Sequence, residues 1–351
     1  MTRDTVNIGG RMIGAGRPCF VIAEAGVNHG GDLEQALRLV DAAADAGADA
    51  VKFQTFRAKD LVTPEAPKAN YQEARCPGSR SQLDLLKALE LSEASHRALM
   101  AHCRDRGILF LSTPFEAGSA DLLESLGLPA FKIPSGELTN LPFLAHLARK
   151  GRPVILSTGM ARLGEIEQAM TVFEAAGLEE VVLLHCVSSY PTASADANLR
   201  AMATLAQVFQ RPVGYSDHTE GLEVSLAAVA LGACVLEKHL TLDRSLPGPD
   251  QQVSLEPGEL KALVRGVRIV TAALGHGRKV PAPCELNTAQ VARKSLVAAM
   301  SLPRGTVLQA HHLVAKRPGT GLPPLQLAEV LGRTLGRDLA KDALLAWEDF
   351  A

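Results

Sequence analysis

Short apolar runs alternate with longer amphipathic stretches along roughly the first 275 residues of the chain. Each run is rich in β-branched or aromatic residues, and a polar turn and a stretch rich in Ala and Leu usually follow it. Eight such runs occur, at residues 20–24, 50–54, 108–112, 130–134, 153–157, 181–185, 212–216 and 234–238. The pattern therefore predicts eight buried strands, most of them separated by helices.

Two of the amphipathic stretches carry clear helix signals. Residues 256–274 have an acidic residue in the first turn and end before Gly275. Residues 32–46 end before Gly47, a common helix terminator. Their apolar positions share one helical face: Leu33, Leu37, Val40 and Ala44.

Eight strand–helix units in succession predict an α/β fold, a (β/α)8 barrel, over residues 1–275. A doubly wound sheet is the alternative, but it usually has fewer strands and a glycine-rich first turn. Residues 24–31 form the first turn here and lack the dinucleotide-binding fingerprint. The long connection after the second strand, residues 57–91, contains several prolines, and we expect it to be a functional loop.

The pattern changes after the barrel. Residues 276–287 combine proline, glycine and charge, which predicts a linker. Residues 288–351 show short strands and closely spaced turns, which predicts a small, mainly-β domain. Because a piece of this size is marginally stable alone, we expect it to dock on another surface.

Composition narrows the possible partners. Apolar residues make up 47% of the chain and charged residues 21%, which is typical of a globular protein with a sizeable core. The net charge of −2 leaves no basic excess for nucleic acid. No apolar run is long enough to span a bilayer, and the N-terminus does not resemble a secretory signal. We therefore expect a cytoplasmic protein without nucleic-acid or membrane partners, whose six cysteines stay reduced.

Polar side chains collect at the ends of the predicted strands, where a barrel builds its active site. Any strand ends where polarity begins, which explains the Ser and Thr residues but not the lysines, because lysine is rarely buried unpaired. Lysines that converge with hydroxyl groups suit a phosphate or a carboxylate. The set comprises Glu24, Lys52, Gln54, Ser112, Thr113, Lys132, Ser135, Ser157, Thr158, His185, Ser216, His218, Lys238 and His239.

Two histidines suggest a metal site. His218 and His239 follow the seventh and eighth strands, and adjacent strands would bring their imidazoles close together. For each histidine alone, a satisfied core residue is the alternative. Asp250 lies on a Gly-Pro turn after the eighth strand, where ordinary turn chemistry is the alternative to a role in the site.

A series of motifs, in order along nearly the whole chain, resembles the sialic acid synthase family. The tail, with RKSL at 293–296 and KRPG at 316–319, resembles the C-terminal antifreeze-like (SAF) domain of that family. The barrel motifs are VIAEAGVNHG at 21–30, VKFQ at 51–54, LSTPF at 111–115, FKIPSG at 131–136, LSTGM at 156–160, HCVSSYP at 185–191, GYSDHTEG at 214–221 and EKHLTL at 237–242.

The resemblance implies an enzyme that condenses phosphoenolpyruvate with an N-acylated hexose and water. The products are phosphate and a nine-carbon 2-keto acid. N-acetylneuraminate synthase, acting on N-acetylmannosamine, is the first expectation. The alternative is a legionaminate or pseudaminate synthase that uses a diacetamido-dideoxy hexose.

The resemblance also assigns residues. His218 and His239 would bind Mn2+ or Mg2+ and, with the acid–base residue Glu24, carry catalysis. The phosphoenolpyruvate site would comprise Lys52, Thr113, Lys132, Ser135, Ser157 and Ser216. The sugar site would comprise Gln54, Tyr190, Asp250 and Arg317.

Arg317 matches an arginine of the SAF domain that reaches the acylamino group in the site of the partner subunit, which implies a domain-swapped homodimer. Two departures from the family concern the substrates. Ser188 stands where the family often has Asn, and residues 251–252 are Gln-Gln where many bacterial members have His-Lys. Two other functions remain open at this point: a different aldol enzyme on the same barrel, and a non-catalytic carbohydrate- or ice-binding protein.

Overall fold

The computed structural model describes residues 4–76, 78–79 and 81–351. The chain divides into two compact units, Met1–Gly275 and His276–Ala351, and each is described by itself. Among the described residues, no helix combines the length and the apolarity needed to cross a membrane.

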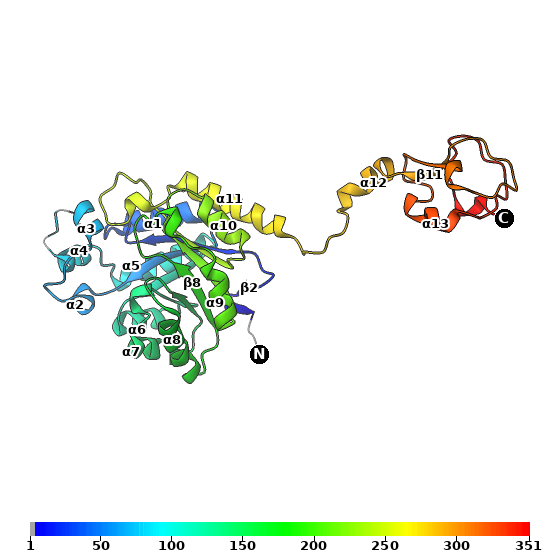
Figure 1. Ribbon diagram of the computed structural model, residues 1–351. Helices are drawn as coiled ribbons and strands as arrows, with labels where there is room; N and C mark the ends of the chain where they lie inside the picture. Colours follow the sequence, from blue (N-terminus) through cyan, green and yellow to red (C-terminus); the bar gives the residue numbers. More distant parts are fainter. Residues whose placement is uncertain (1–3, 77, 80) are drawn as a thin grey trace. The chain divides into compact units, whose positions relative to one another are not determined.

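Eight parallel strands form the centre of the first unit as a nearly closed barrel (Figure 1). Their order is β5-β4-β3-β10-β9-β8-β7-β6, and β5 also contacts β6. Each predicted run coincides with a strand, so the barrel prediction is confirmed. The strands are β3 (Phe20–Gly26), β4 (Ala50–Thr55), β5 (Leu109–Pro114), β6 (Phe131–Ile133), β7 (Val154–Ser157), β8 (Val181–Cys186), β9 (Val213–Asp217) and β10 (Val235–His239).

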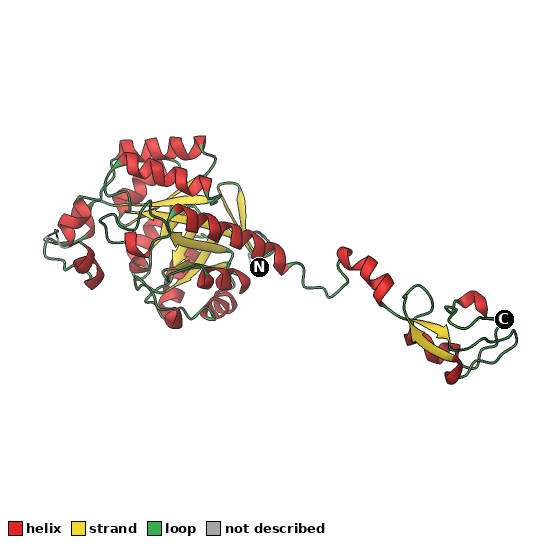
Figure 2. Cartoon of the chain, turned by 90° about the horizontal axis from the view of Figure 1, so that it is seen from above, coloured by secondary structure: helices red, strands yellow, loops and turns green. Residues whose placement is uncertain are grey.

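Helices cover the outside of the barrel strands, as Figure 2 shows. The Asp32 side chain caps the first of them by accepting hydrogen bonds from the backbone N–H groups of Glu34 and Gln35. That helix ends before Gly47, whose φ of +79° suits glycine. The outer helices are α1 (Leu33–Asp45), α5 (Glu93–Asp105), α6 (Ala117–Ser125), α7 (Leu141–Ala148), α8 (Leu163–Ala175), α9 (Ala201–Phe209), α10 (Glu223–Ala230) and α11 (Pro257–Leu274).

An N-terminal hairpin, not predicted from the sequence, precedes the barrel. It pairs β1 (Thr5–Ile8) with β2 (Arg11–Gly14) in antiparallel register. Val6, Ile8 and Ile13 are buried and pack with residues from the beginnings of the barrel strands. The hairpin thus closes the end of the barrel away from the strand termini that carry the polar residues.

The long connection after β4 contains three short helices, α2 (Ala58–Leu61), α3 (Asn70–Arg75) and α4 (Gln82–Lys87). Its apolar side chains pack with Val27 and Phe115 from two neighbouring connections. Helices of this length are marginal alone, so this packing holds them against the barrel.

The second unit contains a small antiparallel sheet of β11 (Ser295–Ala298) and β12 (Leu313–Lys316), with its own apolar core. Isolated bridges extend the pairing, and α13 (Leu327–Val330) is a single turn. The prediction of a small β domain is confirmed. The sequence did not predict α12 (Leu286–Ala292), which begins inside the predicted linker, because its apolar side chains are exposed and form no buried stripe.

Candidate active site

A cavity of about 450 Å3 lies at the C-terminal ends of the barrel strands. It is lined by every residue of the first unit that the family resemblance assigns to the site: Glu24, Lys52, Gln54, Thr113, Lys132, Ser135, Ser157, Tyr190, Ser216, His218, His239 and Asp250. The strand ends therefore bring together residues spread over more than 200 positions of sequence.

Arg317, the remaining predicted site residue, belongs to the second unit. It directly follows β12, and its Nε donates a hydrogen bond to the carbonyl oxygen of Ala292 at 3.0 Å. Its reach into the site of a partner subunit stays a prediction.

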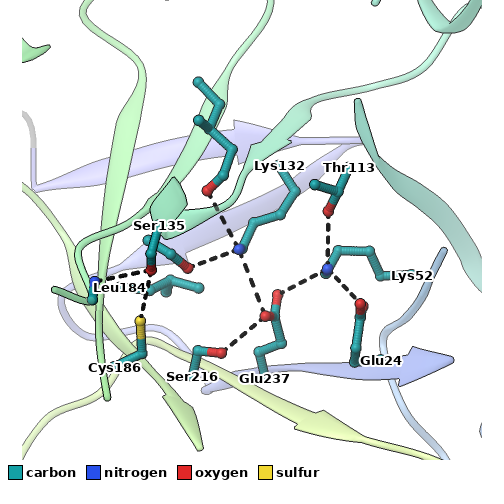
Figure 3. Close-up of polar contacts among 12 residues, drawn as sticks. Glu24, Lys52, Thr113, Lys132, Ser135, Leu184, Cys186, Ser216 and Glu237 are labelled. Atoms are coloured by element: carbon teal, nitrogen blue, oxygen red, sulfur yellow. Dashed lines mark hydrogen bonds and ion pairs between the residues drawn. The ribbon is translucent and has the colours of Figure 1, made fainter. Parts of the chain in front are cut away.

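A chain of buried charges runs across the cavity floor (Figure 3). Lys52 Nζ lies 2.6 Å from Glu24 Oε2 and donates a hydrogen bond to Thr113 Oγ1 at 3.0 Å. Lys132 Nζ donates to Ser157 Oγ at 2.7 Å. Both lysines are almost completely buried, so their charges face the cavity without full hydration.

Glu237 links the two lysines and was missed as a site residue. Its carboxylate lies 3.7 Å from Lys52 Nζ and 3.6 Å from Lys132 Nζ, and it accepts a hydrogen bond from Ser216 at 2.9 Å. A signal was present in the sequence, because Glu237 is two residues from His239 and successive strand residues alternate between faces. Both therefore point into the barrel.

Several other polar residues at the strand ends stabilise the barrel wall. Lys238 does not line the cavity, because its Nζ pairs at 2.9 Å with buried Asp217 on the helix side of the sheet. Thr158 donates to the carbonyl oxygen of Leu184, and Ser112 hydrogen-bonds the Thr55 hydroxyl. For these residues the structural explanation is sufficient.

The charges shift the acidity of the two carboxyl groups in opposite directions. Burial raises the pKa of Glu24 to about 7, against the opposing effect of Lys52. Burial also acts to raise the pKa of Glu237, but Lys132 and Lys52 together outweigh it and lower that pKa. Glu237 therefore stays ionised, and Glu24 is the carboxyl group able to exchange a proton near neutral pH.

The two lysines also differ. Burial lowers the pKa of Lys132, and the attraction of Glu237 only partly opposes it. For Lys52, burial acts in the same direction, but Glu237 and Glu24 outweigh it and raise its pKa. Lys52 is therefore the more firmly protonated of the two cations.

His218 and His239 stand side by side, with ring centroids 5.5 Å apart, and the Tyr190 ring lies 4.2 Å from that of His218. His218 Nδ1 donates to the carbonyl oxygen of Val187 at 2.7 Å, which leaves Nε2 without a proton when the ring is neutral. Burial lowers the pKa of both imidazoles, so the neutral form that binds metals is favoured.

The structure fits a divalent cation at this pair. His239 Nδ1 is buried without a hydrogen-bond partner, and the nearest carboxylate oxygen, from Asp250, is 4.0 Å away. A buried nitrogen without a hydrogen-bond partner is costly, and a bound cation would satisfy it. In the described part of the chain no three His, Cys, Asp or Glu side chains gather as metal ligands, so the remaining ligands would be oxygens of substrate or water. That donor set suits Mn2+ or Mg2+ better than structural zinc.

Comparison with known proteins identifies the family of the chain. The NeuB family model matches residues 39–279, and the SAF domain model matches residues 293–351. The chain belongs to the NeuB family. It is therefore a sialic acid synthase-type enzyme with a C-terminal SAF domain.

Two relatives of this NeuB-family chain carry the name N,N'-diacetyllegionaminic acid synthase. The protein from Legionella pneumophila is 48% identical and the alignment covers 95% of both chains. The protein from Campylobacter jejuni is 47% identical over 93% of this chain and 98% of its own. A solved N-acetylneuraminic acid (sialic acid) synthetase from Leptospira borgpetersenii, in complex with citrate, is 40% identical with a TM-score of 0.72, covering 81% of this chain and 94% of that one.

Proposed function

We propose that this protein condenses phosphoenolpyruvate with an N-acylated hexose and water, and that its product is N,N'-diacetyllegionaminate. One observation supports this class of reaction. The buried charges of Glu24, Lys52, Glu237 and Lys132 lie in one cavity with the two histidines. The two relatives named above support the product. N-acetylneuraminate, the first expectation from the sequence, is the second candidate, supported by the likeness to the Leptospira synthetase.

Phosphoenolpyruvate carries a phosphate and a carboxylate, and the cavity floor offers matching cations. Lys52 and Lys132 would bind these anions, with the hydroxyl groups of Thr113, Ser157 and Ser216 as further donors. Both lysines are already fixed by hydrogen bonds to hydroxyl groups, so little reorganisation accompanies binding.

The reaction joins the methylene carbon of phosphoenolpyruvate to the aldehyde carbon of the open-chain hexose. The aldehyde oxygen takes up a proton to become an alcohol, and positive charge develops at the enol carbon. Water adds to that carbon, and the tetrahedral intermediate expels phosphate to leave the 2-keto acid. Glu24 would accept the proton of the added water, since its carboxyl group titrates near neutrality.

The two histidines and the sugar contacts complete the proposal. His218 and His239 would hold Mn2+ or Mg2+, which acts as a Lewis acid toward the aldehyde. Tyr190 packs against both rings and so limits their movement. Gln54 and Asp250 line the same cavity and would contact hydroxyl or acylamino groups of the sugar.

An end-point assay tests the function directly. Purified protein with Mn2+ and phosphoenolpyruvate receives either 2,4-diacetamido-2,4,6-trideoxymannose or N-acetylmannosamine, and phosphate release and product mass are measured. Turnover mainly with the first sugar supports the proposal, and turnover mainly with the second assigns N-acetylneuraminate. Phosphate release without any sugar would contradict the condensation.

The proposal includes a cytoplasmic, domain-swapped homodimer in which Arg317 completes the site of the partner subunit. Mixing tests this arrangement. Arg317→Ala and His218→Ala should each be inactive alone, and subunit exchange between them should restore part of the activity because one site in the hybrid is intact. Absence of recovery in a hybrid shown to form by mass spectrometry would contradict the swap.

A further inference from the structure

One part of the cavity is apolar and takes no part in the chemistry described above. It is formed by side chains from three connections at the C-terminal end of the barrel: Val27, Phe56, Leu61, Leu85, Leu86 and Phe115. Phe56 and Phe115 meet edge to face, with centroids 6.0 Å apart. We refer to these six residues as the apolar wall.

Most of the apolar wall comes from the long connection after β4. Leu61 closes α2, and Leu85 and Leu86 lie on α4. The same connection places the amide side chains of Gln72 and Gln82 in the lining of the cavity. This segment therefore adds amide groups and hydrocarbon, but no charged side chain, to the described lining.

Packing of the connection against the barrel accounts for only part of the wall. Val27, Phe56 and Leu85 are buried members of one apolar cluster. Leu61 and Leu86 are only partly buried, although they line the cavity. Their exposed apolar surface would be covered by a ligand with hydrocarbon groups.

A hydroxyl group placed against this surface would lose water without gaining a partner, whereas a methyl group would gain contact. The hexoses compatible with the proposed reaction differ in this respect. N-acetylmannosamine ends in a hydroxymethyl group and has one acetyl methyl. A 2,4-diacetamido-2,4,6-trideoxy hexose ends in a methyl group and has two acetyl methyls.

We propose that the apolar wall determines acceptor specificity by receiving methyl groups of the sugar, and so favours acylated 6-deoxy hexoses over hexoses with a free hydroxymethyl group. The inference rests on the proposed function and names the part of the chain that selects the substrate. The amide of Gln82 is suited to hydrogen-bond an acylamino group beside those methyls, as is Nε2 of Gln72, whose Oε1 accepts a hydrogen bond from the Ala69 N–H at 3.0 Å.

Three acceptors separate the sources of the methyl contact: N-acetylmannosamine, its 6-deoxy analogue, and 2,4-diacetamido-2,4,6-trideoxymannose. With wild type, kcat/KM should rise about tenfold or more along this series, since a methyl group in an apolar pocket is worth a factor of that order. If kcat/KM rises between N-acetylmannosamine and its 6-deoxy analogue, the wall contacts the C6 methyl group. If it rises between the 6-deoxy analogue and the trideoxy sugar, the wall contacts the added acetyl group.

Variants then locate the selection. Leu86→Ser should lower kcat/KM for the trideoxy sugar about tenfold or more. It should change kcat/KM for N-acetylmannosamine less than about threefold and leave the KM for phosphoenolpyruvate unchanged. Leu83→Ser is the matched control, because Leu83 lies on the same helix, is partly buried and is not among the described residues lining the cavity. Leu61→Ser repeats the test from α2 if Leu86→Ser does not fold.

Equal loss with all three acceptors, or the same selectivity change in Leu83→Ser, would overturn the role of the wall while the proposed function stands. So would a wild type that is active but indifferent to the methyl groups. A wild type that releases no phosphate with any acceptor would instead contradict the proposed function, and the inference with it.

Discussion

Arg75 donates a hydrogen bond to the backbone carbonyl of Tyr190, with 3.1 Å between Nη2 and the oxygen. The same guanidinium donates to the carbonyl of Pro249 at 2.7 Å. One side chain of the connection after β4 thus fixes two loops from distant parts of the sequence. Those loops carry Tyr190 and Asp250, both of which line the cavity.

Removal of this tether should affect the sugar more than phosphoenolpyruvate. In Arg75→Met we expect the KM for the acceptor to rise about tenfold or more, since two hydrogen bonds from a charged group are lost and each contributes about 1.5–3 kcal/mol. The KM for phosphoenolpyruvate should change little, because Lys52 and Lys132 lie on barrel strands. Steady-state kinetics with each substrate varied in turn measures the difference.

The control for this variant is Lys59→Met, which removes an exposed cation from the same connection. Its kinetics should match those of the wild type. A uniform loss of kcat in Arg75→Met, with both KM values unchanged, would show that Arg75 does not position the sugar site.

Glu237 provides a second prediction, because its carboxylate balances two buried lysines. Glu237→Gln should lower stability by about 3–5 kcal/mol, the usual cost of leaving buried charges without a partner. At roughly 2–4 °C per kcal/mol for a domain of this size, the melting temperature should fall by about 6–20 °C. Phosphoenolpyruvate should raise the melting temperature more in the variant than in the wild type, because its anions replace the missing charge.

Glu124→Gln is the matched control, because it breaks a Lys–Glu pair at the protein surface. Glu124 lies 2.7 Å from Lys150 and its side chain is 41% exposed. Such pairs contribute about 1 kcal/mol or less. Equal destabilisation by the two substitutions would mean that the buried charges contribute no more to stability than a surface ion pair does.

The barrel could be predicted from sequence because its strands are buried on both faces and so appear as continuous apolar runs. The β1–β2 hairpin escaped detection since its strands are only partly buried and so show no continuous apolar run. The helices after β4 and α12 escaped for a related reason: short helices bury few residues and leave weak periodicity.

Part of the site could be predicted, because polar residues at the ends of strands indicate which end of the barrel holds the site. Their polarity does not indicate which face of the sheet a side chain occupies. Lys238 and Glu237 are neighbours in sequence, yet one pairs with Asp217 on the helix side and the other crosses the cavity floor. Polarity alone therefore favours the lysine as much as the glutamate, and only the two-residue spacing between Glu237 and His239 indicates which of them faces the cavity.

The histidine pair predicts metal dependence with a particular signature. His218→Ala and His239→Ala should each abolish detectable Mn2+ binding and lower activity by at least about a hundredfold, since each would remove one of the two proposed protein ligands. Because no third ligand side chain gathers there among the described residues, Mn2+ should bind more tightly when the sugar is present. Calorimetric titration with and without sugar measures this coupling.

The control is His102→Ala, which removes a surface histidine paired with Asp41 at 2.8 Å. It should bind Mn2+ like the wild type. Full activity in the wild type after exhaustive chelation, verified by metal analysis, would contradict metal dependence.

The position of Gly159 leads us to expect a steric effect at the proposed phosphoenolpyruvate site. Its N–H donates to Ser135 Oγ at 2.9 Å, and a Cβ at this position would lie 2.4 Å from Ser188 Oγ and 2.8 Å from Ser135 Oγ. Gly159→Ala should therefore displace both hydroxyl groups and raise the KM for phosphoenolpyruvate about tenfold or more, of the order expected for a lost hydrogen bond.

Gly164→Ala is the comparison, since nothing lies within 4 Å of its added Cβ and it sits on α8. Alanine there should leave the kinetics unchanged and stabilise the helix by up to about 1 kcal/mol. If Gly159→Ala kept the wild-type KM, the serine pair would have no part in substrate binding.

The burial of the cysteines leads to a prediction of how the reactivity of their thiols depends on pH and on folding. Burial raises the pKa of Cys103 and of Cys234 to about 12, so both thiols stay protonated and unreactive at pH 8. Cys284 is exposed and should react first with Ellman's reagent. Burial also raises the pKa of Cys76, which should react more slowly and accelerate as the pH rises toward its pKa.

We therefore expect one fast and one slow thiol in the native protein, and six after unfolding in guanidinium. Cys284→Ser should remove the fast phase and leave the slow phase intact. Fewer than six thiols in the unfolded, unreduced protein would show that a disulfide forms. Reaction of Cys103 in the native protein would mean that the barrel opens faster than its buried packing implies, because this thiol lies in the apolar core and is reached only through such opening.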